Sequence, residues 1–288
     1  MTTAHTWRTF RTCVCLLVLF ADRTSVAFAQ DTQNTQDTQN TQGTREDPAG
    51  LQPAEPEYRL INVPTTLLLP RNKMNFDLTH RFAGNLRGRS FGDSLADLFG
   101  IDQGAIVGLE LRYGVWDRVQ AAFYRTSFDR TIQLHGKWDA IRQQGASPVS
   151  ISGLLSVEAT GNFSDEKSPA FGATISRKIS DVAAVYATPI YVDNVAPNTG
   201  DDLNTFFMGI GGRVRVRPTV YVTAEIAPRL HGYESGEPVY GFSIEKRAGG
   251  HMFQLNFTNG FSTTYAQMAR GGFSDSLYLG FNLARKFF

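Results

Sequence analysis

Apolar residues recur at every second position through most of the chain after residue 73. At the start of this region, Met74, Phe76 and Leu78 alternate with Asn75 and Asp77. A period of two places successive side chains on opposite faces of a β-strand, so each segment has one apolar and one polar face. The strand-like segments are residues 74–82, 105–115, 119–126, 132–140, 149–160, 171–179, 183–192, 206–217, 220–229, 240–247, 253–259 and 277–288.

The number and spacing of these segments favour a membrane barrel over a soluble sandwich. About twelve strands, an even number, suit a single-chain bacterial barrel with both ends on one side of the membrane. Most segments are long enough for a tilted strand to cross a bilayer. Short links such as 116–118 and 217–218 alternate with long ones such as 84–104 and 193–204. We therefore predict an all-β fold, a transmembrane antiparallel up-and-down β-barrel over residues 74–288.

Residues 1–29 have the features of a secretory signal peptide. Two arginines precede an apolar stretch, residues 13–21, which is too short to span a bilayer as a helix. Residues 27–29 (AFA) form a small-x-small cleavage pattern, and we expect cleavage after Ala29. Both cysteines of the chain lie in the apolar stretch, so the mature chain would contain no disulfide and no cysteine metal site.

Two further segments separate this leader from the barrel. Residues 30–58 contain the polar repeat DTQNTQDTQNTQ and a Pro-rich continuation, and we expect a disordered linker that acts as a spacer rather than as a binding tail. Residues 59–73 (RLINVPTTLLLPRNK) are apolar but interrupted by Pro64 and Pro70. This segment leaves two alternatives, an extended lead-in or a plug that packs in or under the barrel.

The last alternating segment ends in two phenylalanines. Its apolar face would lie in lipid, with the aromatic end at the periplasmic interface, where aromatic residues are favoured. Such a strand resembles the carboxyl-terminal signal by which outer-membrane barrels are recognised for insertion, although Arg285 interrupts the apolar face. The residues predicted to form this membrane-insertion strand are Leu277, Leu279, Phe281, Leu283, Phe287 and Phe288.

Four segments together resemble a family of uncharacterised bacterial outer-membrane β-barrel proteins, known as a domain of unknown function. They are THRF at 79–82, DLFGID at 97–102, LRYGVWDRVQAAFYR at 111–125 and KWDAIRQ at 137–143. The resemblance runs over most of residues 59–288 and implies a barrel in the bacterial outer membrane, with no assigned chemistry. The expected partners at that location are the lipid bilayer with its lipopolysaccharide and the machinery that assembles outer-membrane barrels.

If the apolar faces meet lipid, the polar faces line the interior. The period of two places the side chains of Arg213, Arg215 and Arg217 on the same inner face. This row of arginines has two interpretations. The row could form a constriction that favours small anions, or it could pair with carboxylates such as Glu225 and Glu245 in a salt-bridge network. The candidate pore-lining residues are Arg213, Arg215, Arg217, Arg112, Lys137, Arg81, Glu110, Asp139, Glu225 and Glu245.

The sequence gives little support for catalysis. Barrel phospholipases use a serine close to a histidine, and none of the four histidines after residue 29 has such a neighbour in a His-x-Ser arrangement. No pair of histidines has the spacing of metal ligands, and a net charge of +1 gives no case for a nucleic-acid partner. We therefore expect no enzyme, no catalytic residue, no metal and no cofactor.

The pattern favours a passive channel for small solutes with a net basic lumen, for which a small anion is the candidate solute. The alternative is a structural or partner-binding outer-membrane protein with a closed lumen. A barrel enzyme that modifies lipids is the least favoured of the three.

Overall fold

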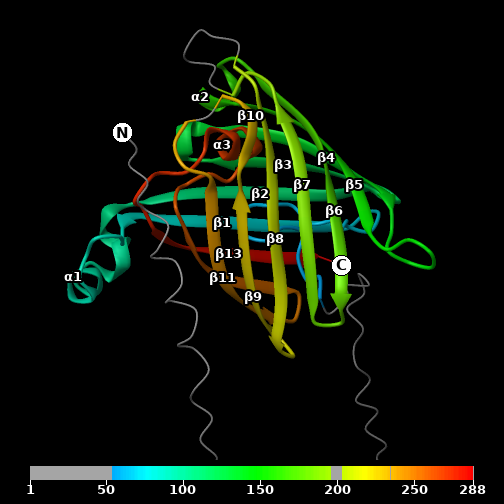
Figure 1. Ribbon diagram of the computed structural model, residues 1–288, viewed down its shortest axis with the longest axis horizontal. Helices are drawn as coiled ribbons and strands as arrows, with labels where there is room; N and C mark the ends of the chain where they lie inside the picture. Colours follow the sequence, from blue (N-terminus) through cyan, green and yellow to red (C-terminus); the bar gives the residue numbers. More distant parts are fainter. Residues whose placement is uncertain (1–53, 196–202, 234, 288) are drawn as a thin grey trace, which may run out of the picture. The chain divides into compact units, whose positions relative to one another are not determined.

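The computed structural model (Figure 1) describes residues 54–195, 203–233 and 235–287. The expected signal peptide at 1–29 and the expected linker up to residue 53 lie outside the described residues, as does Phe288. None of the helices in this part of the chain combines the length and the apolar character needed to cross a membrane.

The described strands form one antiparallel sheet that closes on itself. The ring closes where β1 pairs with β13 and where β8 pairs with β9. β10 follows β9 after Pro228 and pairs with the same neighbour, β8, so β9 and β10 act as one interrupted strand. The result is a closed twelve-strand antiparallel β-barrel, which confirms the fold prediction. The strands are β1 (Met74–Asn85), β2 (Ala105–Trp116), β3 (Val119–Thr126), β4 (Ile132–Ile141), β5 (Ser150–Ala159), β6 (Ser168–Ser180), β7 (Ala183–Val192), β8 (Thr205–Arg217), β9 (Val220–Ala227), β10 (Arg229–Gly232), β11 (Val239–Ala248), β12 (His251–Thr258) and β13 (Tyr278–Phe287).

The two faces of the ring differ as the alternation requires. On β2, Leu109 and Leu111 are each 45% exposed on the outside, whereas Glu110 between them is 2% exposed on the inside. A closed ring leaves no sheet edge, so its backbone groups pair with one another and the outer face can be fully apolar. The outside is therefore suited to hydrocarbon, and the inside collects the polar side chains.

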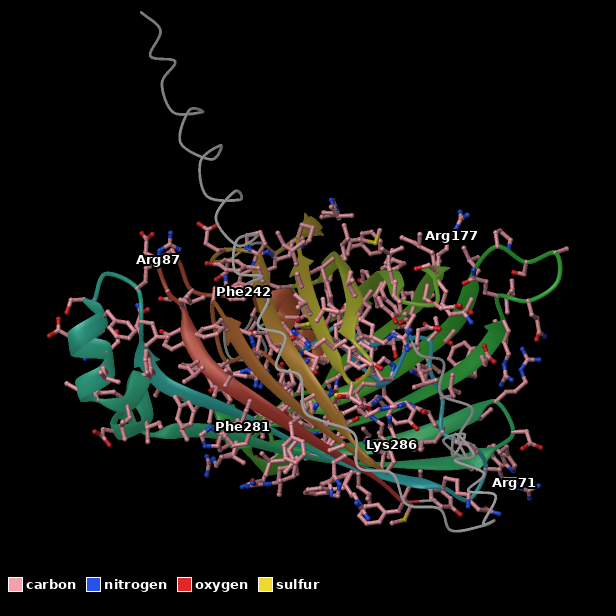
Figure 2. All side chains as sticks on the ribbon, turned by 90° about the horizontal axis from the view of Figure 1, so that it is seen from below. Arg71, Arg87, Arg177, Phe242, Phe281 and Lys286 are labelled. Atoms are coloured by element: carbon pink, nitrogen blue, oxygen red, sulfur yellow. The ribbon has the colours of Figure 1, made fainter. Side chains whose placement is uncertain are left out.

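The two ends of the barrel also differ. One end carries short turns, such as 117–118 and 218–219, and the other carries the long connections. Figure 2 places Arg71 and Lys286 toward the short-turn end and Arg87 toward the long-loop end. The long connections contain α1 (Phe91–Ala96), η1 (Leu98–Gln103), α2 (Thr160–Phe163) and α3 (Tyr265–Arg270), and η2 (Phe128–Arg130) lies between β3 and β4.

The chain before β1 is folded inside the barrel. The prediction of a disordered linker is wrong for its last residues: Ala54 is 1% exposed and Tyr58 is 0% exposed. These residues are ordered because the barrel wall binds them, with the Tyr186 hydroxyl donating to Glu55 at 3.2 Å. The following residues up to 70 contact the inward faces of many strands. Residues 59–73 were expected to form either an extended lead-in or a plug, and these contacts are those of a plug.

The last strand largely follows the pattern expected of it. Leu279, Phe281 and Leu283 are half-buried on the outer face, and Phe287 is 48% exposed at the short-turn end. Leu277 lies just outside the strand, because β13 begins at Tyr278; its carbonyl accepts from the N–H of Leu86 at 2.7 Å.

Candidate functional site in the barrel lumen

The lumen is occupied by residues 54–70, here called the plug. The plug is a hairpin: Arg59 and Pro64 face each other in a bridge, and the N–H of Leu60 donates to the carbonyl of Val63 at 2.8 Å. A second hydrogen bond joins the N–H of Thr65 to the carbonyl of Tyr58 at 3.0 Å. Glu55, in the first arm, and residues 66–71, in the second arm, line the same cavity at the short-turn end. Both arms of the hairpin therefore meet at that end, and its tip points into the barrel.

A carboxylate on the wall binds the tip of the plug. Glu225 of β9 accepts the backbone N–H of Ile61 at 2.9 Å, of Asn62 at 2.9 and 3.0 Å, and of Val63 at 3.0 Å. Successive N–H groups that converge in this way form an anion-binding nest. The charge of Glu225 is thus bound by backbone dipoles, and the turn at 60–63 is fixed in one orientation.

The arginine of the plug binds the opposite part of the wall. Arg59 is 5% exposed, and its Nε lies 2.8 Å from Asp77 of β1. Its guanidinium also contacts Glu110 of β2. Glu110 in turn pairs with Arg112 at 2.6 Å and with Nε2 of His135 at 2.9 Å. Buried charges are tolerated only when they are paired in this way, so Arg59 completes the network of the wall.

Two lysines bind carbonyl groups of the plug. Lys137 of β4 donates to the carbonyls of Thr65 and Leu67, both at 2.6 Å. Lys286 of β13 donates to the carbonyl of Pro56 and lies 3.6 Å from Glu57. An extended segment has carbonyls that no ladder satisfies, and these ammonium groups satisfy them.

The arginine row of β8 has a structural role at its inner member. Arg213 is fully buried and pairs with Glu245 of β11 at 2.8 and 3.1 Å, and it also donates to the carbonyl of Arg59 at 2.7 Å. Arg215 is only half-buried. Placing Arg217 in the lumen is wrong: it is exposed, because the register between β8 and β9 shifts after Arg215 and the strand then ends.

The remaining candidate residues lie on the inner face and are buried. Arg81 donates to Asn282 at 2.8 Å and to Asn62 of the plug at 3.2 Å. Asp139 pairs with Arg142 and with Arg118 near the short-turn end. The buried candidates are therefore Arg81, Glu110, Arg112, Lys137, Asp139, Arg213, Glu225 and Glu245.

Three inward amides that sequence reasoning did not single out also bind the plug. Gln254 of β12 donates to the carbonyl of Leu60 at 2.8 Å, and Asn282 of β13 donates to that of Ile61 at 3.1 Å. Gln120 of β3 accepts the N–H of Leu69 at 3.0 Å. In the sequence, only the alternation places these amides on the inner face. It does not indicate their partners, because those lie far away along the chain.

The long-loop end of the lumen is filled by α3. Glu158 of β5 accepts the hydroxyl of Thr264 at 2.6 Å and the N–H of Ala266 at 3.1 Å. Thr264 and Gln267 form a capping box, which starts the helix. Met268 and Ala269 then pack in an apolar cluster with wall residues such as Phe207. The Thr-x-x-Gln signature at residues 264–267 is the signal in the sequence that indicates this helix start.

Little open space remains inside the barrel. A cavity of about 20 Å³ lies between the plug, the wall and α3, lined by residues such as Tyr58, His135 and Tyr265. A cavity of about 580 Å³ lies at the short-turn end, below the plug. Its charged lining residues are Glu55, Arg71, Asp117, Arg118, Asp139, Arg142 and Lys178. We call this second cavity the vestibule.

Three of the four described histidines contact residues other than serine. His135 pairs with Glu110 inside the barrel, and His251 contacts Arg285 on the outside. His80 stacks on Phe281, with ring centroids 4.7 Å apart. In residues 54–195, 203–233 and 235–287, no group of three or more His, Cys, Asp or Glu side chains is placed to hold a metal ion.

The model of one protein family, described as a membrane bound beta barrel domain (DUF5777), matches residues 57–287. The chain belongs to the DUF5777 family. This confirms the resemblance to a barrel family of unknown function. The match begins inside the plug, so the DUF5777 domain includes nearly all of the hairpin as well as the barrel. No curated protein matches the chain.

Several solved structures that are similar to this DUF5777 barrel are porins. A NanC porin structure aligns with a TM-score of 0.50 and 6% identity over 75% of this chain and 100% of that one. A KdgM porin aligns with a TM-score of 0.48 and 8% identity over 74% of this chain and 99% of that one. A mutant of the Rh. blastica porin reaches a TM-score of 0.34 at 12% identity, over 63% and 55% of the two chains. At these identities, the NanC likeness shows the barrel fold alone.

Proposed function

We propose that the protein is a channel for small solutes in the bacterial outer membrane, closed by its own plug in this conformation and conducting when the plug leaves the lumen. The observation that carries the proposal is the chemistry of the plug contacts. The wall binds the hairpin through ion pairs and hydrogen bonds, as between Glu225 and residues 61–63. Water can replace each of these contacts, because the net contribution of a hydrogen bond to a charged group is only about 1.5–3 kcal/mol.

The proposed orientation follows from the two ends of the barrel. In outer-membrane barrels, short turns face the periplasm and long loops face the outside. The vestibule would then open to the periplasm, and the plug would withdraw in that direction. The bilayer with its lipopolysaccharide surrounds the barrel in this proposal, the barrel assembly machinery inserts it, and a small anion is the candidate solute.

A disulfide between the plug and the wall provides the test. A Cβ added at Gly209 of β8 would lie 3.0 and 3.2 Å from the two methyl groups of Val63. This separation suits a disulfide in the double variant Val63→Cys/Gly209→Cys. The mature chain is expected to be free of cysteine, so the pair would be unique. In planar bilayers, the oxidised variant should be silent, and the reduced variant should show conductance steps.

Two controls make the outcome decisive. Each single cysteine variant should conduct equally with and without reductant. A variant that lacks residues 54–70 should conduct continuously if it assembles as a heat-resistant barrel. Equal conductance of the oxidised and reduced double variant would contradict gating by the plug. Silence of both the reduced pair and the assembled deletion variant would contradict the channel.

The second candidate function is a structural or partner-binding barrel whose lumen stays closed. It is favoured by how completely the plug and α3 fill the interior, which leaves a cavity of only about 20 Å³ between them. Hydrogen exchange distinguishes the two functions. A permanent plug would exchange its amides at 61–63 only with global unfolding, whereas a gate would exchange them in the folded barrel.

The charge preference of the open channel is a separate part of the proposal. Arg215 is inward and half-buried, and it is not among the residues that bind the plug, so it can act on a passing solute. Arg215→Gln in the plug-deleted barrel should shift the reversal potential in a salt gradient toward cations. An unchanged potential would contradict anion selection by Arg215. The proposal contains no catalytic step.

A further inference from the structure

The first long connection folds against the outside of the barrel. Gly84 lies near the end of β1, two positions after Phe82, and a Cβ added there would overlap the Cα of Gly100 in η1. Gly100 has φ +91°, a conformation that glycine adopts without strain. The N–H of Ala83 also donates to the carbonyl of Gly104 at 2.9 Å. The two glycines thus let η1 lie directly on the outer wall, and Figure 1 shows α1 projecting away from the strands.

This connection carries a concentrated apolar surface. Phe91 is 74% exposed, Leu95 51%, Leu98 52% and Ile101 44%. Phe91 and Leu95 are four residues apart in α1, so they share one face of the helix. Phe99 packs edge-on against Phe91, with ring centroids 6.1 Å apart. An exposed patch of this kind marks a surface that contacts something other than water.

The opposite side of the connection is polar and fixed by local contacts. Ser90 caps α1 by accepting the N–H of Asp93 at 3.1 Å, and it donates to the Asp93 carboxylate at 2.8 Å. Arg89 pairs with Asp97. The hydrogen bond from Arg89 lowers the pKa of Asp97, so its carboxylate stays ionised at neutral pH. The connection is therefore amphipathic, with a charged side and an apolar side.

The apolar side continues the outer face of the barrel. The residues of β1 that precede Gly84 on the same face are Phe82 and His80. Both rings pack with Phe281 of β13, at centroid distances of 6.2 and 4.7 Å. This aromatic group lies at the long-loop end of a surface that the DUF5777 family places in a membrane. Aromatic residues at such a level are typical of the membrane interface.

We infer that the connection formed by α1 and η1 is a membrane anchor, with Phe91, Leu95, Leu98 and Ile101 inserted among the acyl chains beside the long-loop end. Its occupant is lipid, because the apolar patch is continuous with the lipid-facing surface of β1 and β13. A short amphipathic segment with aromatic and leucine side chains on one face and acids on the other can lie in the interface in this way. The inference does not depend on conduction through the lumen.

Fluorescent labels at two positions of α1 test the inference. Leu95→Cys and, as the matched control about 100° around the helix, Ala96→Cys each receive an NBD label; Ala96 is also exposed. The full-length barrel is reconstituted in phosphatidylcholine vesicles at low protein-to-lipid ratio. We expect the label at 95 to be quenched several-fold more by lipid with a shallow doxyl group than the label at 96. Iodide in the water should quench them in the reverse order.

Two results would overturn the anchor. Equal quenching of both labels by iodide would place the apolar face in water. Shielding of position 95 from iodide without quenching by doxyl lipid would mean that a protein, such as a second copy of this chain, covers the patch. A heat-modifiability gel on each labelled variant verifies that the barrel is folded before quenching by doxyl lipid or by iodide is measured.

Discussion

The backbone N–H of Asn62 donates to both carboxylate oxygens of Glu225, at 2.9 and 3.0 Å, across 163 positions of the chain. One wall residue thus recognises the shape of a turn rather than a side chain. Ile61 and Val63 supply the flanking N–H groups to the same carboxylate. This contact joins the hairpin to β9 and makes Glu225 the natural first target for mutation.

Replacing Glu225 by Gln should loosen the tip of the plug. The amide keeps one acceptor oxygen but turns an N–H₂ group toward backbone donors, so buried N–H groups lose their partner at a cost of about 1–3 kcal/mol. We expect the amides of residues 61–63 to exchange hydrogen faster while those of the strands do not change. Glu237→Gln, an exposed position, is the control. Unaltered exchange at 61–63 would show that the nest is not what fixes the turn.

Arg213→Met should lower the free energy of unfolding by about 3–5 kcal/mol, because it leaves Glu245 buried without its main partner. Urea titration in lipid vesicles measures this quantity. The double variant Arg213→Met/Glu245→Leu should be less destabilised than the single one, since no unpaired charge remains. Arg217→Gln on the same strand is exposed and should change stability by less than about 0.5 kcal/mol. Equal effects at 213 and 217 would contradict the buried pair.

Thr264→Ala should weaken the N-terminus of α3 by about 1 kcal/mol, the usual cost of losing a side-chain cap. The hydroxyl also donates to Glu158, so both the capping box and the link to β5 are affected. Faster proteolysis within residues 262–272 of the folded barrel is the expected result. Ser274→Ala, exposed in the same connection, should leave the cleavage rate as it is. If both variants are cut equally fast, the cap does not hold α3 in the lumen.

Gly84→Ala should displace η1 from the outer wall, because the new methyl group would occupy the place of Gly100. The amide of Gly104 and its neighbours in η1 should then exchange faster, with the urea midpoint of the barrel unchanged. Gly92→Ala is the matched control, since the nearest atom to its new Cβ is the Ser90 hydroxyl at 3.7 Å. Protection of η1 that survives Gly84→Ala would mean that the close approach of the two glycines is not needed.

The barrel could be predicted from the sequence because lipid imposes a simple requirement on every second residue. Leu109 and Leu111 must be apolar whatever the lumen contains, and Glu110 must not face hydrocarbon. That requirement recurs in strand after strand, so local irregularities do not hide it. The position of Arg217 was missed for the opposite reason: the bulge between β8 and β9 depends on pairing, which period two alone does not reveal.

The plug and α3 were harder to predict because a polar inward face looks the same whether it meets water or protein. Nothing near Glu225 in the sequence indicates that its partner is the turn at 60–63. Glu158 likewise binds Thr264, 106 positions away. The pairing of Arg213 with Glu245, by contrast, was one of the two interpretations drawn from the sequence, since strands close in order bring the two side chains together.

The hairpin stands immediately before β1, and β1 completes the ring by joining the final strand, β13. Three partners of its tip, Glu225, Gln254 and Asn282, belong to strands made late in synthesis. A newly made chain therefore contains the plug before it contains most of the barrel. The plug can complete its contacts only once the last strands are in place. The plug does not have to enter a barrel that has already closed. It is covalently joined to β1, so the pairing of β1 with β13 can close the barrel around it.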